Sequence, residues 1–357
     1  MDTNFKPNWH HVGAYLGLTF GLTWLLDLAI YLRGGLQSPG IVASLQLQML
    51  LPAFSAIVLG IFFFPESPIY RKKHIGQGRW FYYYFLLLTL IYAVGTLVIL
   101  LFPQQSIIAV LAAIPLVLAF LGLFLLIVLR FTAGRDVLAR VWLAWGKGRY
   151  WLLFGLGFVA YYVLQAVLNA SFGLGGAKLA PPAVPPGLGL NVFLILAAIQ
   201  SVLLAPILAI VIAFGEEYGW RGYLQSELFK LGRVRGVLLL GVIWGIWHWP
   251  LILMGYNYPG HPFLGMLLMA LYTTGLAVVL GYAVLRSGSV LVSAYLHALN
   301  NQVVAFIAAM GFKPFDNAFS FGIGLFGIAT LTLVSILILR DPIWRARGGG
   351  LADSSSE

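Results

Sequence analysis

The chain has 357 residues, of which 61% are hydrophobic and only 9% are charged, and its mean hydropathy is +0.93. Ordinary soluble domains carry about 25% charged residues, so this composition excludes a soluble globular protein and indicates a polytopic membrane protein. The sequence contains no cysteine, which excludes disulfides, a thiolate nucleophile and cysteine metal ligands. The formal net charge is +10, and its distribution along the chain decides between a nucleic-acid partner and a membrane topology.

Apolar runs long enough to cross a bilayer, about 20 residues each, recur along the whole chain. If 190–230 crosses once they number ten, which predicts an all-α, polytopic transmembrane helical bundle. The first run has only Lys6 ahead of it and no small-residue cleavage pattern after it, so we expect a retained helix rather than a signal peptide. The expected spans are 12–32, 41–64, 80–102, 107–129, 150–170, one within 190–230, 236–254, 263–285, 289–310 and 321–339.

Lysine and arginine alternate from loop to loop. With both termini cytoplasmic, 17 of the 21 basic residues fall in inside segments, 3 fall in outside segments, and Arg221 lies within the membrane. This asymmetry follows the positive-inside rule, so the basic charge reflects topology and we expect no nucleic-acid partner. The chain is predicted to be a multi-pass protein in contact with the lipid bilayer of a cell membrane, namely the cytoplasmic membrane of a bacterium.

The loops suggest how the chain is divided. The stretch 171–189 is rich in glycine and proline and is predicted to be an irregular outer loop between two halves. The predicted parts are an N-terminal membrane module of about five helices (1–189), a core (190–311), a final transmembrane helix (312–340) and a disordered cytoplasmic tail (341–357).

Three acidic residues lie inside the expected spans, namely Asp27, Glu216 and Glu217. Ionisable side chains are rare in lipid and are functional candidates wherever they occur. Asp27 lies near the outer end of its helix, where Arg33 or interfacial water could satisfy it, so a structural role is favoured there. The adjacent pair of glutamates, followed by Arg221, is not near a helix end where interfacial water could satisfy it.

Two histidines inside helices, His248 and His297, follow the glutamate pair. A single buried histidine is more often structural, but two of them after a buried Glu-Glu pair favour a catalytic role. At about 1.5 Å per residue, His248 lies about 18 Å into a hydrocarbon core about 30 Å thick. A helix through 206–230 would place Glu216 at about 21 Å, nearly the same depth. We therefore expect 206–230 to be the spanning helix and 190–204 to be a kinked or interfacial lead-in.

Helical spacing assigns these side chains to faces. Glu217 and Arg221 are four residues apart and are predicted to pair, which leaves Glu216 facing another direction. His297 and Asn301 are also four apart and project on one side of their helix. A free glutamate can transfer a proton, an imidazole can hold a water, and a His–Asn pair can donate hydrogen bonds to an oxyanion. Together these groups predict a water-activating hydrolase site within the membrane.

Three short motifs stand in order in the C-terminal half. They are Glu216-Glu217-x-x-x-Arg221, Trp244-x-x-x-His248 and His297-x-x-x-Asn301. In order and spacing they resemble the signature of the CPBP family of intramembrane proteases, which includes Ras-converting CAAX endopeptidases and bacterial Abi proteins, some tied to bacteriocin immunity. The similarity covers about 206–305, and it departs from the family at the second motif, which usually begins with Phe. The N-terminal half, 1–189, shows no resemblance of this kind.

The resemblance implies a CAAX-type intramembrane endopeptidase that hydrolyses a peptide bond of a membrane-associated peptide or protein. Prenylated chains are among the substrates of the family, but nothing in this sequence itself indicates a prenylated substrate. By the same resemblance, Glu216 would be the general base and His248 would position the water. His297 with Asn301 would form the oxyanion site.

Glu217 and Arg221 are supporting residues in this scheme. The family is commonly described as metalloproteases, and Glu216, His248 and His297 form a plausible zinc ligand set. The sequence has no His-Glu-x-x-His pair, however, and a glutamate-activated water without metal accounts for the same residues. Both mechanisms, with and without zinc, stay open at this point.

Two other classes of function fit part of the pattern. A proton-coupled transporter with a buried Glu/His/Arg relay would explain the intramembrane charges. It would not explain the His-x-x-x-Asn spacing or the order of the motifs. A catalytically inactive relative that acts by binding, such as a bacteriocin-immunity protein, would keep the motifs without the reaction.

Overall fold

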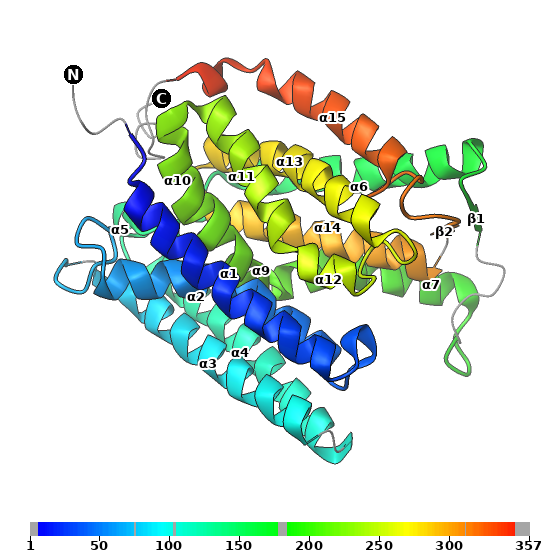
Figure 1. Cartoon of the computed structure of the whole chain (residues 1–357), viewed down its shortest axis with the longest axis horizontal. Coiled ribbons are helices and arrows are strands. Elements are labelled where there is room, and N and C mark those ends of the chain that lie inside the picture. The colour runs from blue at the N-terminus through cyan, green and yellow to red at the C-terminus, as the bar shows by residue number, and fades with distance from the viewer. Residues whose placement is uncertain (1–5, 75, 103–104, 178–183, 311, 347–357) are drawn as a thin grey trace.

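The computed structural model describes residues 6–74, 76–102, 105–177, 184–310 and 312–346. It is a bundle of helices with a small two-stranded ribbon at one end (Figure 1). Helices dominate because a segment in lipid must satisfy its own backbone hydrogen bonds. The predicted all-α, polytopic helical protein is thereby confirmed.

The elements of the first half are α1 (Trp9–Leu32), α2 (Ile41–Phe62), α3 (Arg79–Leu101), α4 (Gln105–Thr132), α5 (Arg135–Arg140), α6 (Gly148–Ser171) and β1 (Gly175–Ala177). Those of the second half are α7 (Leu190–Ile199), π-helix η4 (Gln200–Leu204), α8 (Ala205–Leu208), α9 (Ile210–Glu217), π-helix η5 (Tyr218–Leu224), α10 (Gln225–Leu228), α11 (Arg233–Trp247), α12 (Trp249–Leu253), α13 (Pro262–Ser287), α14 (Val290–Met310), β2 (Phe312–Pro314) and α15 (Leu325–Leu339). Short 3-10 turns η2 (Gly35–Gln37), η3 (Gly76–Gly78), η6 (Phe229–Leu231) and η7 (Pro342–Arg345) complete the described chain.

Seven helices of the described residues are long and apolar enough to cross a membrane. Two shorter apolar helices, Leu116–Thr132 and Leu325–Leu339, join them within the same residues. Every predicted span overlaps helical structure, but 321–339 begins before α15 and 236–254 is divided between α11 and α12. The number of crossings, ten, and the cytoplasmic position of both termini stay predictions.

The segment 190–231 differs from the prediction in its first part. Residues 190–204, expected as a lead-in, belong to the helical segment Leu190–Leu208, which is itself apolar enough to span a membrane. Its leucine, isoleucine and valine side chains face outward, with only 6% of the residues in that window buried. A break follows at Ala209. Beyond it the chain is helical through the charged motif, as predicted, and α9 is buried along its whole length.

Glycines let the N-terminal helices approach this buried segment closely. A Cβ at Gly215 would collide with the backbone of α2 at the carbonyl of Met49. One turn later, a Cβ at Gly219 would lie 2.5 Å from the Cβ of Pro52 and 2.6 Å from the hydroxyl of Tyr15. Small residues at such spacing are the usual means of close helix contact in membranes. The α9–η5 segment is therefore locked against α1 and α2.

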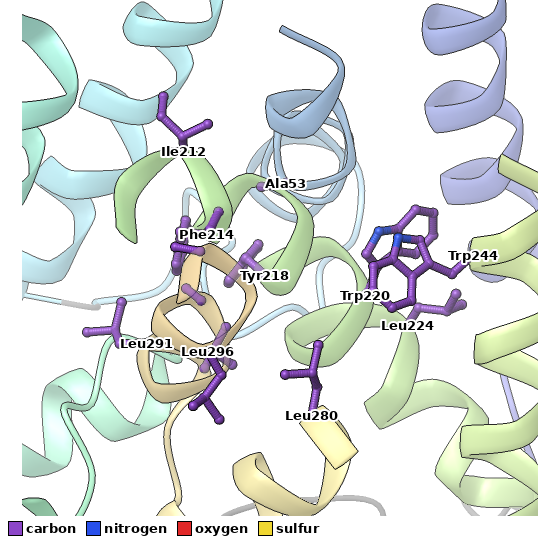
Figure 2. Packing of buried hydrophobic residues seen from close by; sticks show 14 of the residues in the cluster. Ala53, Ile212, Phe214, Tyr218, Trp220, Leu224, Trp244, Leu280, Leu291 and Leu296 are labelled. Carbon is purple, nitrogen blue, oxygen red and sulfur yellow. The ribbon is translucent and has the colours of Figure 1, made fainter. Parts of the chain in front are cut away.

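The opposite side of the α9–η5 segment packs against α14 and an aromatic cluster. Phe214 lies 5.2 Å from Phe81 and 5.6 Å from Phe85 between ring centroids. Figure 2 shows Phe214 and Tyr218 among buried side chains of α2 and α14. One hydrophobic cluster thus joins helices from both predicted halves. The division at 189 stays a prediction, and the core around the charged motif does not follow it.

Two features near the ends of the predicted parts were not expected. Strand β1 pairs antiparallel with β2, with Gly175 opposite Pro314, so the glycine-rich loop is tied to the end of α14; residues 178–183 of that loop lie outside the described residues. The start of the predicted tail differs from the prediction, because residues Pro342–Arg345 form η7 and Trp344 is buried. Residues 347–357 of the tail lie outside the described residues.

Candidate active site

Glu217 is fully buried and accepts hydrogen bonds at both carboxylate oxygens. Arg221 Nη1 donates to Oε1 over 2.9 Å, and His297 Nδ1 donates to the same oxygen over 2.8 Å. The hydroxyl of Ser293 donates to Oε2. The predicted pair with Arg221 is therefore present, and two further donors from α14 complete the set. A carboxylate so fully engaged holds α9, η5 and α14 together and is not free to accept a proton from a ligand.

Arg221 is 0% exposed and lies over the indole of Trp244, with 4.1 Å between its guanidinium carbon and the ring centroid. This geometry gives a cation–π contact in a desolvated setting. Within the described residues its Nε and Nη2 have no hydrogen-bond partner. Arg221 therefore links η5 to α11 and balances the charge of Glu217.

Glu216 has a different environment from its neighbour. Its Oε2 accepts a hydrogen bond from the indole Nε1 of Trp244 over 2.8 Å. Its Oε1 faces the imidazole of His297, at 3.9 Å from Nε2. Because only one neutral donor holds this carboxylate within the described part of the chain, Oε1 can accept a proton from a molecule in the adjacent cavity. Trp244 is thus a site residue in its own right, a role that its aromatic character alone did not predict.

His248 lies at the junction of α11 and α12, where Pro250 begins a new helical turn. Its Nδ1 lies 2.9 Å from the carbonyl oxygen of Trp244. A carbonyl only accepts, so Nδ1 carries the proton and Nε2 of the neutral ring is an acceptor. The side chain before it, Trp247, donates its indole N–H to Thr23 of α1 over 2.9 Å, which fixes the junction against the N-terminal half.

His297 lies between the two glutamates. Its Nδ1 is bonded to Glu217, and its Nε2 points to Glu216. With the Nδ1 proton committed to the carboxylate, Nε2 accepts hydrogen bonds in the neutral ring and donates them only in the imidazolium form. The Glu217 contact therefore fixes the ring orientation. Whether Nε2 is protonated decides whether His297 donates or accepts a hydrogen bond in the cavity.

Asn301 is exposed to the cavity, and its carboxamide orientation is set by its neighbour. Asn300 Nδ2 donates to Asn301 Oδ1 over 3.1 Å. The hydroxyls of Tyr162 and Tyr272 in turn lie at Asn300 Oδ1, the second at 3.2 Å. Because Oδ1 of Asn301 is taken, its Nδ2 is left to donate to a ligand. The two tyrosines had no signal in the sequence, since they are ordinary members of apolar helices.

A cavity of about 320 Å³ joins the four residues predicted to be catalytic. Glu216, His248, His297 and Asn301 all line it, whereas Glu217 and Arg221 lie behind its wall. Helices α2, α9, α11, α12, α13 and α14 contribute to the lining together with the loop before α13. The remaining lining residues are Leu45, Gln48, Met49, Trp244, Trp247, Leu251, Tyr256, Asn257, Met269, Tyr272, Thr273, Leu276, Asn300, Val304, Ala305 and Ile323.

The side chains do not form the zinc site considered from the sequence. Among the described residues, no three His, Asp or Glu side chains are grouped so that they could hold a metal ion. Glu216 has one oxygen bonded to Trp244, and its other oxygen is 3.9 Å from His297. The donor set of Glu216, His248 and His297 does not fit a metal in this arrangement, so no step of the reaction is assigned to one.

Comparison with known proteins finds a family match in the second half of the chain. Residues 198–303 match the family model of Type II CAAX prenyl endopeptidase Rce1-like proteins. No curated protein and no solved structure matches the chain. The matched segment contains all three motifs, from Glu216 to Asn301, while α1 and α2 lie outside it. This match supports a CAAX-type family of intramembrane proteases for residues 198–303, and the rest of the chain lies outside it.

Proposed function

We propose that this protein is an intramembrane endopeptidase that uses Glu216 to activate a water against a peptide bond of a membrane-associated chain. One observation carries the proposal: Glu216 has an unbonded carboxylate oxygen that faces a cavity shared with His248, His297 and Asn301. A general base must lie within reach of the proton it takes, and here base, water site and oxyanion donors open on the same space.

The first step uses the acceptors of the cavity. A water between Glu216 Oε1 and His248 Nε2 can donate one proton to each. Glu216 takes the first proton as the water oxygen attacks the carbonyl carbon, and His248 keeps the second O–H aligned. When the C–N bond breaks, the protonated Glu216 returns its proton to the departing amine.

The second part of the site would stabilise the tetrahedral intermediate. Asn301 Nδ2 is free to donate, because Asn300 occupies its Oδ1. His297 Nε2 can donate as well when the ring is an imidazolium, a charge that Glu217 would balance at Nδ1. Two aimed donors in a water-poor cavity are the usual form of an oxyanion site.

The family description supports a substrate that ends in a prenylated CAAX-type sequence, and a bilayer location supports a lipid-anchored one. The test is cleavage of a quenched fluorescent, farnesylated peptide by the protein in liposomes. Glu216→Gln, His248→Ala and His297→Ala should each lose activity by at least about a hundredfold. Glu66→Gln and His10→Ala, at positions outside the cavity, should cleave as the parent does.

The outcomes separate the alternatives. Unchanged cleavage in all three site variants would refute the proposal. Proton flux into liposomes that is lost in Glu216→Gln, without peptide cleavage, would favour a transporter. Cleavage that continues after treatment with a zinc chelator would agree with a glutamate-activated water and would place metal outside the reaction.

A further inference from the structure

Helix α2 supplies part of the cavity wall, although it lies outside the segment that matches the family. Leu45, Gln48 and Met49 line the cavity from this helix, and Gln48 is the polar member of the three. The close contact of Met49 with Gly215 sets the position of α2 next to the glutamate motif. Gln48 is therefore held in the cavity wall by packing that a shift of α2 would break.

Behind Gln48 lies an acid that has no charged partner among the residues that the structure describes. Asp27 of α1 is 1% exposed, and the carboxamide Nε2 of Gln48 donates to its Oδ1. Arg33, the partner considered from the sequence, is replaced in this role by Gln48. Within the described residues, Asp27 Oδ2 has no hydrogen-bond partner. Burying an acid in this way is costly, so its presence calls for a role that outweighs the cost.

Helix α1 is itself fixed to the active-site helices. The indole of Trp24 donates to the carbonyl of Trp247 over 3.3 Å, and the indole of Trp247 donates to Thr23 over 2.9 Å. Thr23 and Asp27 are one turn apart on the same buried face of α1. Asp27 is thus positioned with respect to His248, the next residue after Trp247. The two α1 helix contacts hold the acid at a fixed place behind the cavity wall.

This arrangement selects which end of the Gln48 carboxamide meets the cavity. With Nε2 directed to Asp27, Oε1 is the atom left for a ligand, and it makes no hydrogen bond within the described part of the chain. A side-chain amide oxygen accepts and does not donate. An extended peptide offers backbone N–H groups at regular spacing, and binding proteins recognise such strands through main-chain hydrogen bonds.

We propose that Gln48 is a substrate-binding residue whose Oε1 accepts a backbone N–H of the peptide near the bond to be cleaved. Asp27 is a positioning residue that turns the Gln48 carboxamide. This inference rests on the proposed protease function and adds a part of the site that the N-terminal helices supply.

The variant Gln48→Leu removes the amide oxygen that would accept the peptide N–H. The variant Asp27→Leu removes the carboxylate that orients the Gln48 carboxamide. Each should raise the KM for the farnesylated peptide by about tenfold with kcat nearly unchanged, because the lost hydrogen bond serves the bound substrate and its transition state alike. The double variant should be no worse than either single one. Asp27→Asn, unlike Asp27→Leu, keeps an acceptor for Gln48 Nε2 and should have the same KM as the parent. Gln200→Leu, an exposed glutamine on η4, is the matched control.

Peptides in which single amide N–H groups are replaced by ester oxygen identify the bond directly. At one position, the ester substitution should raise the KM of the parent by about tenfold and leave the KM of Gln48→Leu unaffected. An unchanged KM in Gln48→Leu, or no sensitive position in the parent, would overturn the inference. If Gln48→Leu does not fold, the ester series on the parent and on Asp27→Leu decides, because the sensitive position should lose its effect in Asp27→Leu as well. Loss of cleavage in Glu216→Gln shows independently that the protease function stands.

Discussion

The adjacent glutamates provide the sharpest test, because neighbouring residues of one type are assigned opposite roles. Glu217 is 0% exposed and bonds an equally buried Arg221, His297 and Ser293. In Glu217→Gln the guanidinium keeps a neutral acceptor but loses its counter-charge. Breaking one side of a buried ion pair costs about 3–5 kcal/mol, so we expect a loss of unfolding free energy of about 3 kcal/mol.

Glu216→Gln should behave in the opposite way. Its carboxylate accepts one hydrogen bond, from Trp244, and a glutamine carbonyl can accept the same bond. The change in unfolding free energy should therefore stay within about 1 kcal/mol, while peptide cleavage is lost. Arg221→Met combined with Glu217→Gln should recover much of the stability lost by the single Glu217 variant, because the uncompensated charge is gone.

Both quantities can be measured on the same preparations. Reversible unfolding in mixed detergent micelles gives the free energy of unfolding, and the fluorescent peptide gives the rate of cleavage. Equal stability of the two glutamine variants would refute the assignment of Glu217 as the structural member. Full activity in Glu216→Gln with loss of activity in a stable Glu217→Gln would reverse the two roles.

Three further predictions address the surroundings of the site. Gly215→Ala should lower the unfolding free energy by about 1–3 kcal/mol, because the added Cβ meets the backbone of α2. Gly157→Ala, with open space around its Cβ, should cause no such loss, and thermal unfolding in detergent measures both. Tyr162→Phe should lower kcat about tenfold with little change in KM, since the network that orients Asn301 loses a donor; an unchanged kcat would contradict this role. Burial raises the pKa of the Asp341 carboxyl, but hydrogen bonds from the Ile343 backbone, Tyr282 and Arg286 outweigh it and hold the pKa below its usual value. Its stabilising contribution is therefore present above the pKa of the unfolded chain, about 3.9, and is lost as pH falls through the lower folded value, so unfolding of Asp341→Asn and the parent should differ at pH 7 and converge in strong acid.

The sequence by itself determined the class of protein and the local pairs. Apolar runs of membrane-spanning length leave a chain in lipid with little choice but helices, and the helical bundle follows. The Glu217–Arg221 pair was predictable because residues four apart on a helix are neighbours whatever surrounds them. The order of the three motifs predicted the resemblance to CAAX-type proteases, and the match over 198–303 supports it.

Only the tertiary structure decided which groups meet across helices. Glu217 bonds His297, Trp244 bonds Glu216, and Asp27 bonds Gln48, and each pair joins two different helices. Helical periodicity gives the face on which a side chain lies but not the helix that packs against that face. That choice depends on which surfaces allow close approach, as Gly215 does for α2. The three motifs could therefore be recognised in the sequence, and the helix α2 wall of their cavity could not.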